Sequence, residues 1–230
     1  MPLNLPLETA QISAAQRLHA RLEQWQLVEK ALAALGAEFP GCAPHEVLLK
    51  ATVVNALYGT NVLAIERMAR HVANVLARVD IHSAGPELVE QLAVPSQAGK
   101  TKTRRHYSFA SKFTHFFLNA ERYPIMDKYA TQMVKIHLGQ KRILSDPDHP
   151  YIAFSHNYDL LKKAARFTGS NREMDHYLWL AGEYLAWKKN RTAQINSEAR
   201  TLFEHHSPAA AEELDALMPS ILDKAFRGEL

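Results

Sequence analysis

The chain has 230 residues, of which 47% are hydrophobic and 22% are charged, a composition typical of a globular protein. Its only cysteine, Cys42, excludes disulfide bonds within the chain and any four-cysteine zinc or iron–sulfur site. The formal net charge of +3 is too small to identify a partner by itself. This length favours one large domain or two small lobes that share a core, and we expect a single domain over residues 1–230.

Neither a membrane segment nor a metal site is indicated. The N-terminus has no hydrophobic signal sequence, and no apolar run approaches the length of a membrane span. The twelve histidines include no pattern of the HExxH type, and the adjacent His205 and His206 cannot share one face of a helix. We therefore expect a cytoplasmic protein that has no cofactor, no metal and no contact with a membrane.

Helical periodicity continues through most of the chain, and no segment keeps the alternation of a β-strand. Gly36, Pro44, Gly59 and Pro124 are the clearest boundary signals, because proline opens helices and glycine ends them. The sequence therefore predicts an all-α fold with a loop over residues 139–150. The predicted helices cover residues 7–35, 44–58, 61–79, the stretch around Lys112, 124–138, 151–168, 171–188, 190–205 and 208–226. A short segment around residues 86–92 and a Gly/Ser/Lys-rich stretch at 95–103 separate the third of these helices from the fourth.

The densest group of chemically usable side chains lies around Lys112 and Asp127. Lys112 stands within a run of phenylalanines whose helical spacing forms one apolar stripe, comprising Phe109, Phe113, Phe116 and Phe117. An amine at the border of such a stripe is partly desolvated, which disfavours the ammonium form and leaves more free nucleophile. Asp127 follows in or near the first turn of the next predicted helix. The two form a candidate catalytic pair, although such a lysine usually reaches solvent and such a carboxylate usually caps a helix.

A basic run precedes this stretch. Lys100, Lys102, Arg104 and Arg105 stand close together, which favours an anionic partner. A solvated loop that has no partner is an equally good interpretation of the run by itself.

Three segments, in this order, resemble the signature of the helix-hairpin-helix DNA glycosylases. The sequence SFASK-(FTHFFLNAERYPIM)-D, residues 108–127, is similar to the hairpin turn G-x-G-x-K and the later aspartate of that superfamily. The sequence HEVLLKATVVNALYGTNVLAIERMARHV, residues 45–72, is similar to the helix–turn–helix before the hairpin. MDHYLWLAGE, residues 174–183, resembles the closing helix of the 8-oxoguanine glycosylase branch. Together the segments cover about residues 44–190.

The resemblance implies two helical lobes around a central cleft, with residues 44–190 as the core and helices at 7–35 and 190–228 packed on it. It also implies a monomeric DNA glycosylase that flips a damaged or modified base out of double-stranded DNA and excises it. Lys112 would attack C1′ of the sugar, Asp127 would accept a proton and stabilise the charge on the sugar, and strand cleavage by AP lyase activity would follow. The closing helix favours an oxidised purine as the target, and a modified pyrimidine, as in phage DNA, is the alternative.

The resemblance also assigns DNA contacts. The turn that contains Tyr58, Thr60 and Asn61 would face the minor groove, with Tyr58 either filling the gap left by the flipped nucleotide or packing beneath the turn. Ser108 and Ala110 take the hairpin positions, and the basic run supplies further phosphate contacts. The residues expected around the flipped base are Asn55, His115, Tyr177, Trp179 and Trp187. Tryptophans at helical spacing are, however, more often part of a core.

The sequence departs from the family pattern at three points. Ser108 and Ala110 replace the hairpin glycines, which bring a backbone close to a phosphate. The interval from Lys112 to Asp127 is shorter than usual by about one helical turn. The cysteine ligands of the iron–sulfur cluster in the endonuclease III branch are absent. Two other functions stay open: a non-catalytic helical DNA-binding module on the same scaffold, and an enzyme that uses Lys112 on a carbonyl substrate other than DNA.

Overall fold

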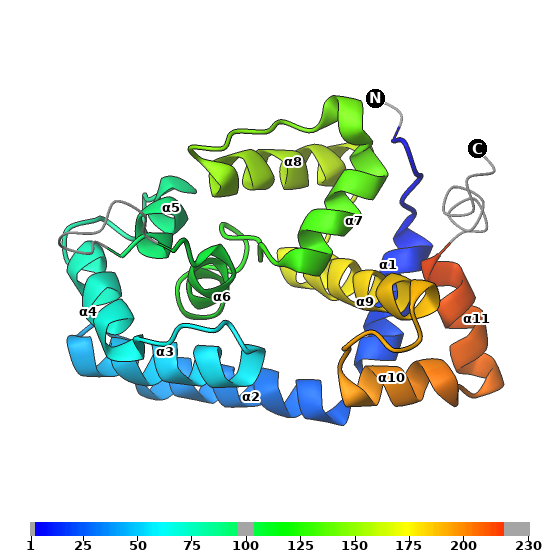
Figure 1. Cartoon of the computed structure of the whole chain (residues 1–230), viewed down its shortest axis with the longest axis horizontal. Helices are drawn as coiled ribbons and strands as arrows, with labels where there is room; N and C mark the ends of the chain where they lie inside the picture. Colours follow the sequence, from blue (N-terminus) through cyan, green and yellow to red (C-terminus); the bar gives the residue numbers. More distant parts are fainter. Residues whose placement is uncertain (1–2, 96–103, 219–230) are drawn as a thin grey trace. The chain divides into compact units, whose positions relative to one another are not determined.

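The computed structural model describes residues 3–95 and 104–218. Within them every regular element is a helix, which confirms the all-α class (Figure 1). None of the described helices is long and apolar enough to cross a membrane. The chain forms two compact units, in which unit 1 comprises Met1–Leu27, Lys128–Leu144 and His156–Leu230, and unit 2 comprises Val28–Asp127 and Ser145–Ser155. The boundaries fall within α2 (Glu23–Glu38) and α8 (Pro150–Ala164), so both helices contribute to both units.

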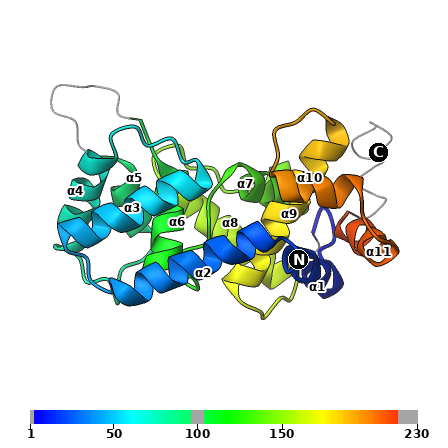
Figure 2. The same cartoon turned by 90° about the horizontal axis from the view of Figure 1, so that it is seen from below.

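Unit 2 is built around one central helix, α6. Besides parts of α2 and α8, the unit contains α3 (Pro44–Tyr58), α4 (Ile65–Leu76), α5 (Glu87–Ala93) and α6 (Tyr107–Phe117). Both α3 and α5 pack against α4 and α6 (Figure 2). Phe109 and Phe113 of α6 are at most 1% exposed, so the apolar stripe recognised in the sequence forms part of the core.

Helix α3 begins and ends at the residues that the sequence predicts. Pro44 lies in its first turn, where a missing N–H leaves no hydrogen bond unmade. Gly59 follows the helix with a left-handed φ of +54°, a conformation that favours glycine.

The turn after α3 differs from the prediction, because α4 begins at Ile65 rather than at Asn61. The side chain of Asn55 holds the intervening residues. Its Oδ1 accepts hydrogen bonds from Val62 N (3.0 Å) and Thr60 Oγ1 (2.8 Å), and its Nδ2 donates to the Val62 carbonyl (3.1 Å). These bonds offer the backbone an alternative to a helix, and Asn61 takes a left-handed φ of +56°.

Unit 1 is built around α9 (Asn171–Lys189). Its other helices are α1 (Thr9–His19), α7 (Lys128–Leu138), the 3₁₀ helix η1 (Gln140–Arg142), α10 (Ser197–Glu204) and α11 (Pro208–Leu217). Helices α1, α7 and α10 pack on α9, and α11 packs on α1. A Cβ at Gly182 of α9 would lie 2.6 Å from the Cβ of Tyr129, so α7 and α9 approach this closely because residue 182 has no side chain.

A buried polar contact ties the N-terminal segment into unit 1. The His137 Nδ1–H donates to the Leu5 carbonyl (3.0 Å), and its Nε2 accepts from the Tyr177 hydroxyl (2.8 Å). Burial lowers the pKa of His137 to about 4, so the ring is neutral at neutral pH. Tyr177 itself is 0% exposed. Tyr177, which we expected to line a base pocket, is therefore a core residue of unit 1.

The predicted helix over residues 7–35 is two helices, α1 and α2. They are separated at residues 20–22, where the amides of Arg21 and Leu22 donate to carbonyls three residues earlier. No glycine or proline marks this break, so the sequence offers no local signal for it. Conversely, α2 continues past Gly36, where we expected it to stop, and ends at Glu38.

Later boundaries also shift. Helix α7 begins four residues after Pro124, and α10 begins at Ser197 rather than at residue 190. The predicted helix over 208–226 extends to Leu217, and residues 219–230 lie outside the described part of the chain.

Candidate active site

Lys112 and Asp127 form an ion pair inside unit 2. The Lys112 Nζ lies 3.1 Å from the Asp127 Oδ2. Their side chains are 6% and 17% exposed, so both charged groups are largely removed from water. Taking two charges out of water is costly, and a buried pair seldom adds net stability, so such a pair is a candidate for a functional role.

Three kinds of group surround the Lys112 amine. Besides the carboxylate, the amine donates to the Ser108 Oγ at 3.1 Å, from one helical turn earlier. It also lies 5.5 Å from the centre of the Tyr58 ring, within the range of a cation–π contact. Tyr58 in turn stacks on Phe116, with ring centres 5.4 Å apart. The amine is therefore held between a carboxylate, a hydroxyl and an aromatic face.

Buried side chains hold the segment that leads to Asp127. The Nδ1–H of His115 donates to the Tyr123 carbonyl (2.9 Å), and the Tyr151 hydroxyl donates to the Pro124 carbonyl (2.9 Å). His115, which we expected in the base pocket, is 3% exposed and fixes this backbone instead. The position of Asp127 is thus set by α6 and α8 together.

Tyr58, Thr60 and Asn61, which we expected at the minor groove, and Asn55, which we expected in the base pocket, have different surroundings. Asn55 and Thr60 bond to one another within the turn after α3, so these side chains build the turn. Tyr58 packs beside Lys112 and Phe116 of α6. Asn61 is exposed at the tip of the turn and stays a candidate for a DNA contact.

The two residues that replace the hairpin glycines lie in the first turn of α6 rather than in a turn before it. The Ala110 side chain is 0% exposed, and its amide donates to the His106 carbonyl (2.9 Å). Contrary to the expectation, Ala110 therefore has neither a side chain nor an amide to offer a phosphate. The Ser108 hydroxyl accepts from Lys112, which places it beside the candidate nucleophile.

The basic run is only partly described. Lys100 and Lys102 lie outside the described residues. Arg104 and Arg105 are exposed, and the Nη1 of Arg105 donates to the Pro147 carbonyl (2.7 Å). Both arginines thus have guanidinium groups at the surface of unit 2.

The predicted base-pocket tryptophans belong to unit 1. Trp187 is 5% exposed and packs against Tyr184 and Phe203, so it is a core residue and not part of an open pocket. Trp179 is partly exposed, with its ring centre 4.8 Å from that of Trp25.

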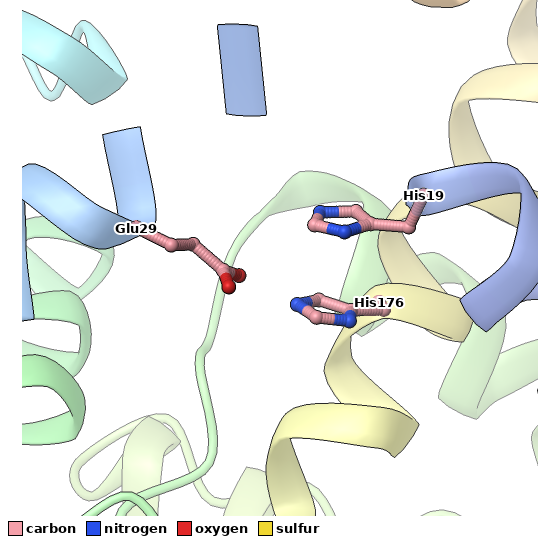
Figure 3. Close-up of side chains that lie close together, drawn as sticks. All are labelled: His19, Glu29 and His176. Atoms are coloured by element: carbon pink, nitrogen blue, oxygen red, sulfur yellow. The ribbon is translucent and has the colours of Figure 1, made fainter. Parts of the chain in front are cut away.

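A pair of histidines that the sequence did not indicate lies in unit 1. The rings of His19 and His176 stack with centres 3.7 Å apart and planes 11° apart (Figure 3). Their Nδ1 atoms lie 3.1 Å from the Gln26 Nε2 and 2.9 Å from the Gln16 Oε1, respectively. Imidazole nitrogens are common metal ligands, and one ring nitrogen of His19 lies within 4.8 Å of one ring nitrogen of His176. Glu29, also labelled in Figure 3, belongs to unit 2.

A shallow hollow of about 530 Å³ lies at the start of α4. Leu63, Arg67 and Arg70 contribute to its lining. Leu63 is 92% exposed, and Arg70 pairs with Glu66 at 2.6 Å. The sequence prediction missed this surface because it placed residue 63 inside a helix.

Comparisons with known proteins show one family model and one relative that are similar to this chain, and neither description states an activity. The family model HI_0787_N, described as an N-terminal domain, matches residues 11–122, a range that includes Lys112 and stops before Asp127. An uncharacterized protein of Haemophilus influenzae (strain ATCC 51907 / DSM 11121 / KW20 / Rd) is 29% identical over 139 residues. That match covers 60% of this chain and 66% of the relative's length. No solved structure matches the chain.

Proposed function

We propose that this chain is a DNA glycosylase in which Lys112 is the nucleophile and Asp127 the activating carboxylate. The observation that carries the proposal is the buried pair itself, with 3.1 Å between the Lys112 Nζ and the Asp127 Oδ2. A nucleophilic amine needs a nearby base to take its proton, and a cation that develops on a sugar needs a nearby negative charge. One carboxylate at hydrogen-bond distance from the amine serves both needs.

The proposed reaction begins with a nucleotide flipped out of the duplex, since C1′ is inaccessible inside it. Lys112 gives one proton to Asp127, and its nitrogen lone pair forms a bond to C1′. The N-glycosidic bond breaks, its electron pair leaves with the base, and the base takes up a proton. Asp127 stabilises the positive charge on the sugar while that bond breaks.

Strand cleavage follows from the same adduct. Opening of the sugar ring converts the C1′–nitrogen bond into an iminium ion. Loss of a proton from C2′ then expels the 3′ phosphate, and water hydrolyses the imine to release Lys112. This sequence makes the proposed enzyme a glycosylase with AP lyase activity.

The proposed substrate is double-stranded DNA that contains a damaged or modified base, bound by a monomer of the protein. Arg104, Arg105 and Asn61 are exposed and available for phosphate or groove contacts. The resemblance of residues 174–183 favours an oxidised purine. Because Tyr177 of that segment and Trp187, which follows it in α9, are both buried, the choice of base rests on the resemblance and not on a pocket.

Two alternatives make different use of the same features. A non-catalytic DNA-binding module would keep the scaffold and the arginines, and would have no need of a buried amine beside a carboxylate. An enzyme that acts on another carbonyl substrate would use Lys112 for an imine without DNA. The exposed arginines favour an anionic partner over this second alternative.

The test is a panel of duplexes, each with one lesion, incubated with the full chain and with three variants. Abasic-site formation measures base excision, and borohydride reduction traps the lysine–sugar imine as a covalent adduct. Lys112→Gln keeps much of the packing but forms no imine, and Asp127→Asn keeps the shape of the side chain without its charge. Lys50→Gln is the matched control, since Lys50 is also buried beside an aromatic ring, 5.5 Å from the centre of Phe117, but donates to the Gly41 carbonyl.

We expect trapping in the wild type and in Lys50→Gln, none in Lys112→Gln, and excision slower by about two to four orders of magnitude in Asp127→Asn. DNA affinity should change little in all three, because phosphate contacts dominate it. Wild-type excision rates in both Lys112→Gln and Asp127→Asn would overturn the assignment. DNA binding without excision of any lesion would favour the non-catalytic module.

A further inference from the structure

A hydrogen bond joins the chain neighbours of the two proposed catalytic residues. Ser111 directly precedes Lys112, and Met126 directly precedes Asp127. The Met126 amide donates to the Ser111 Oγ at 3.0 Å. Ser111 is 0% exposed, so water does not compete for this bond.

This use of a helical serine is unusual in one respect. Serine hydroxyls within helices commonly donate to a carbonyl of the preceding turn, and the Ser111 Oγ also lies 3.4 Å from the Ser108 carbonyl. The bond from Met126 is shorter, and it comes from a different part of the chain, fifteen residues away. The Ser111 hydroxyl therefore accepts a hydrogen bond from a backbone amide that lies outside α6.

We propose that Ser111 is a positioning residue that holds the Asp127 carboxylate against the Lys112 amine. His115 and Tyr151 fix the same segment, but they bind the carbonyls of Tyr123 and Pro124, farther along the chain from Asp127. Ser111 binds the last residue before Asp127. Its effect on catalysis rests on the proposed function, whereas its effect on the geometry of the Lys112–Asp127 pair does not.

The matched control is the next buried hydroxyl of the same helix. Thr114 is also 0% exposed, and its Oγ1 donates to the carbonyls of Ala110 and Ser111, within α6. Thr114→Val removes a buried hydroxyl at nearly constant volume without touching the segment before Asp127. Ser111→Ala removes the acceptor for Met126, and Ser111→Thr restores a hydroxyl.

Two measurements on the full chain separate the outcomes. The first is the single-turnover rate of borohydride trapping at saturating DNA, measured across pH. The second needs no DNA: trace labelling by acetic anhydride across pH, with the Lys112 peptide quantified by mass spectrometry against the Lys50 peptide as an internal reference.

For Ser111→Ala we expect trapping slower by about tenfold to a hundredfold at unchanged DNA affinity, because small displacements of a catalytic group have effects of this size. Labelling of Lys112 relative to Lys50 should increase across the pH range, since a displaced carboxylate no longer holds the Lys112 amine at 3.1 Å. Thr114→Val should leave both profiles unchanged, and Ser111→Thr should restore most of the wild-type behaviour.

An unchanged labelling profile in Ser111→Ala would overturn the positioning role, whatever the trapping rate. If wild type gives no adduct with any duplex but the labelling profile of Ser111→Ala still moves, the glycosylase proposal fails and the positioning role stands. If Ser111→Ala does not fold, Ser111→Cys, which keeps a similar volume with a weak sulfur acceptor, should move the profile in the same direction. A wild-type profile in a folded Ser111→Cys variant would then count against the role.

Discussion

A double-mutant cycle on Lys112 and Asp127 distinguishes a pair kept for chemistry from a pair kept for stability. The single variants are Lys112→Met and Asp127→Asn, and the third variant combines them. Each single change leaves one charge in a site where the side chains are 6% and 17% exposed. The combined change removes both charges, and the Asn at position 127 keeps the shape of the aspartate side chain.

The magnitudes follow from the geometry. At 3.1 Å, two unit charges attract by roughly 5 kcal/mol at an effective dielectric constant of about 20. The cost of desolvation offsets much of this attraction, so a single variant should lose about 3–5 kcal/mol through the charge left behind. The combined variant should lose far less than the sum of the two, which gives a coupling energy of about 2 kcal/mol or more.

Urea unfolding followed by far-UV circular dichroism is the suitable assay. The three tryptophans, Trp25, Trp179 and Trp187, all belong to unit 1, so fluorescence alone would miss a change confined to unit 2. A stable combined variant without excision activity would show that the pair serves the reaction. Additive losses, with a coupling energy below about 0.5 kcal/mol, would refute the reasoning from the buried geometry.

Four further predictions address other parts of the chain. In thermal melts Gly182→Ala should lower the free energy of unfolding by about 1–2 kcal/mol, because overpacking against α7 outweighs the gain in helix propensity. The control is Gly36→Ala, whose Cβ would meet Phe117 at an ordinary 3.5 Å. It should leave the free energy of unfolding unchanged or raise it by up to about 1 kcal/mol. Replacing Arg104 and Arg105 by Gln should weaken binding to all duplexes alike and flatten the slope of log affinity against log salt by about one to two units. An unchanged slope would show that both arginines are solvated side chains that contact no phosphate. Burial lowers the pKa of His137 to about 4, so the unfolded chain binds the proton more readily than the folded chain. The free energy of unfolding should therefore fall by up to about 3 kcal/mol as pH drops from about 6.5 to about 4. In urea unfolding, His137→Gln should lack this part of the pH dependence. Excision should survive treatment with a chelator, and loss of turnover that zinc or magnesium restores would contradict a metal-free mechanism.

Periodicity predicted the helices well where local signals decide them. Pro44 and Gly59 bound α3 as expected, because the fixed φ of proline and the left-handed φ of glycine act locally. The break between α1 and α2 and the late start of α4 were not predictable in this way. At the start of α4 the decisive contacts come from the side chain of Asn55, whose bonds compete with the helix.

For the candidate site, the sequence indicated the two charged groups but not their surroundings. Lys112 could be placed beside an apolar stripe from spacing alone, whereas its contacts with Ser108 and the Tyr58 ring depend on how α3 packs against α6. Tyr177 and Trp187 were assigned to a pocket because aromatic residues suit both a flipped base and a core. Burial decides between the two, and burial is a tertiary property.

The order of segments in unit 1 has a consequence for synthesis on the ribosome. Helix α1 leaves the ribosome well before the helices it packs on, because α9 and α11 are made more than a hundred residues later. Most of unit 2 is one continuous segment, Val28–Asp127, and is complete well before α9 emerges. We therefore expect unit 2 to fold during translation, at a time when the apolar face of α1 is still exposed to solvent. A chaperone that binds the nascent chain should then bind at α1.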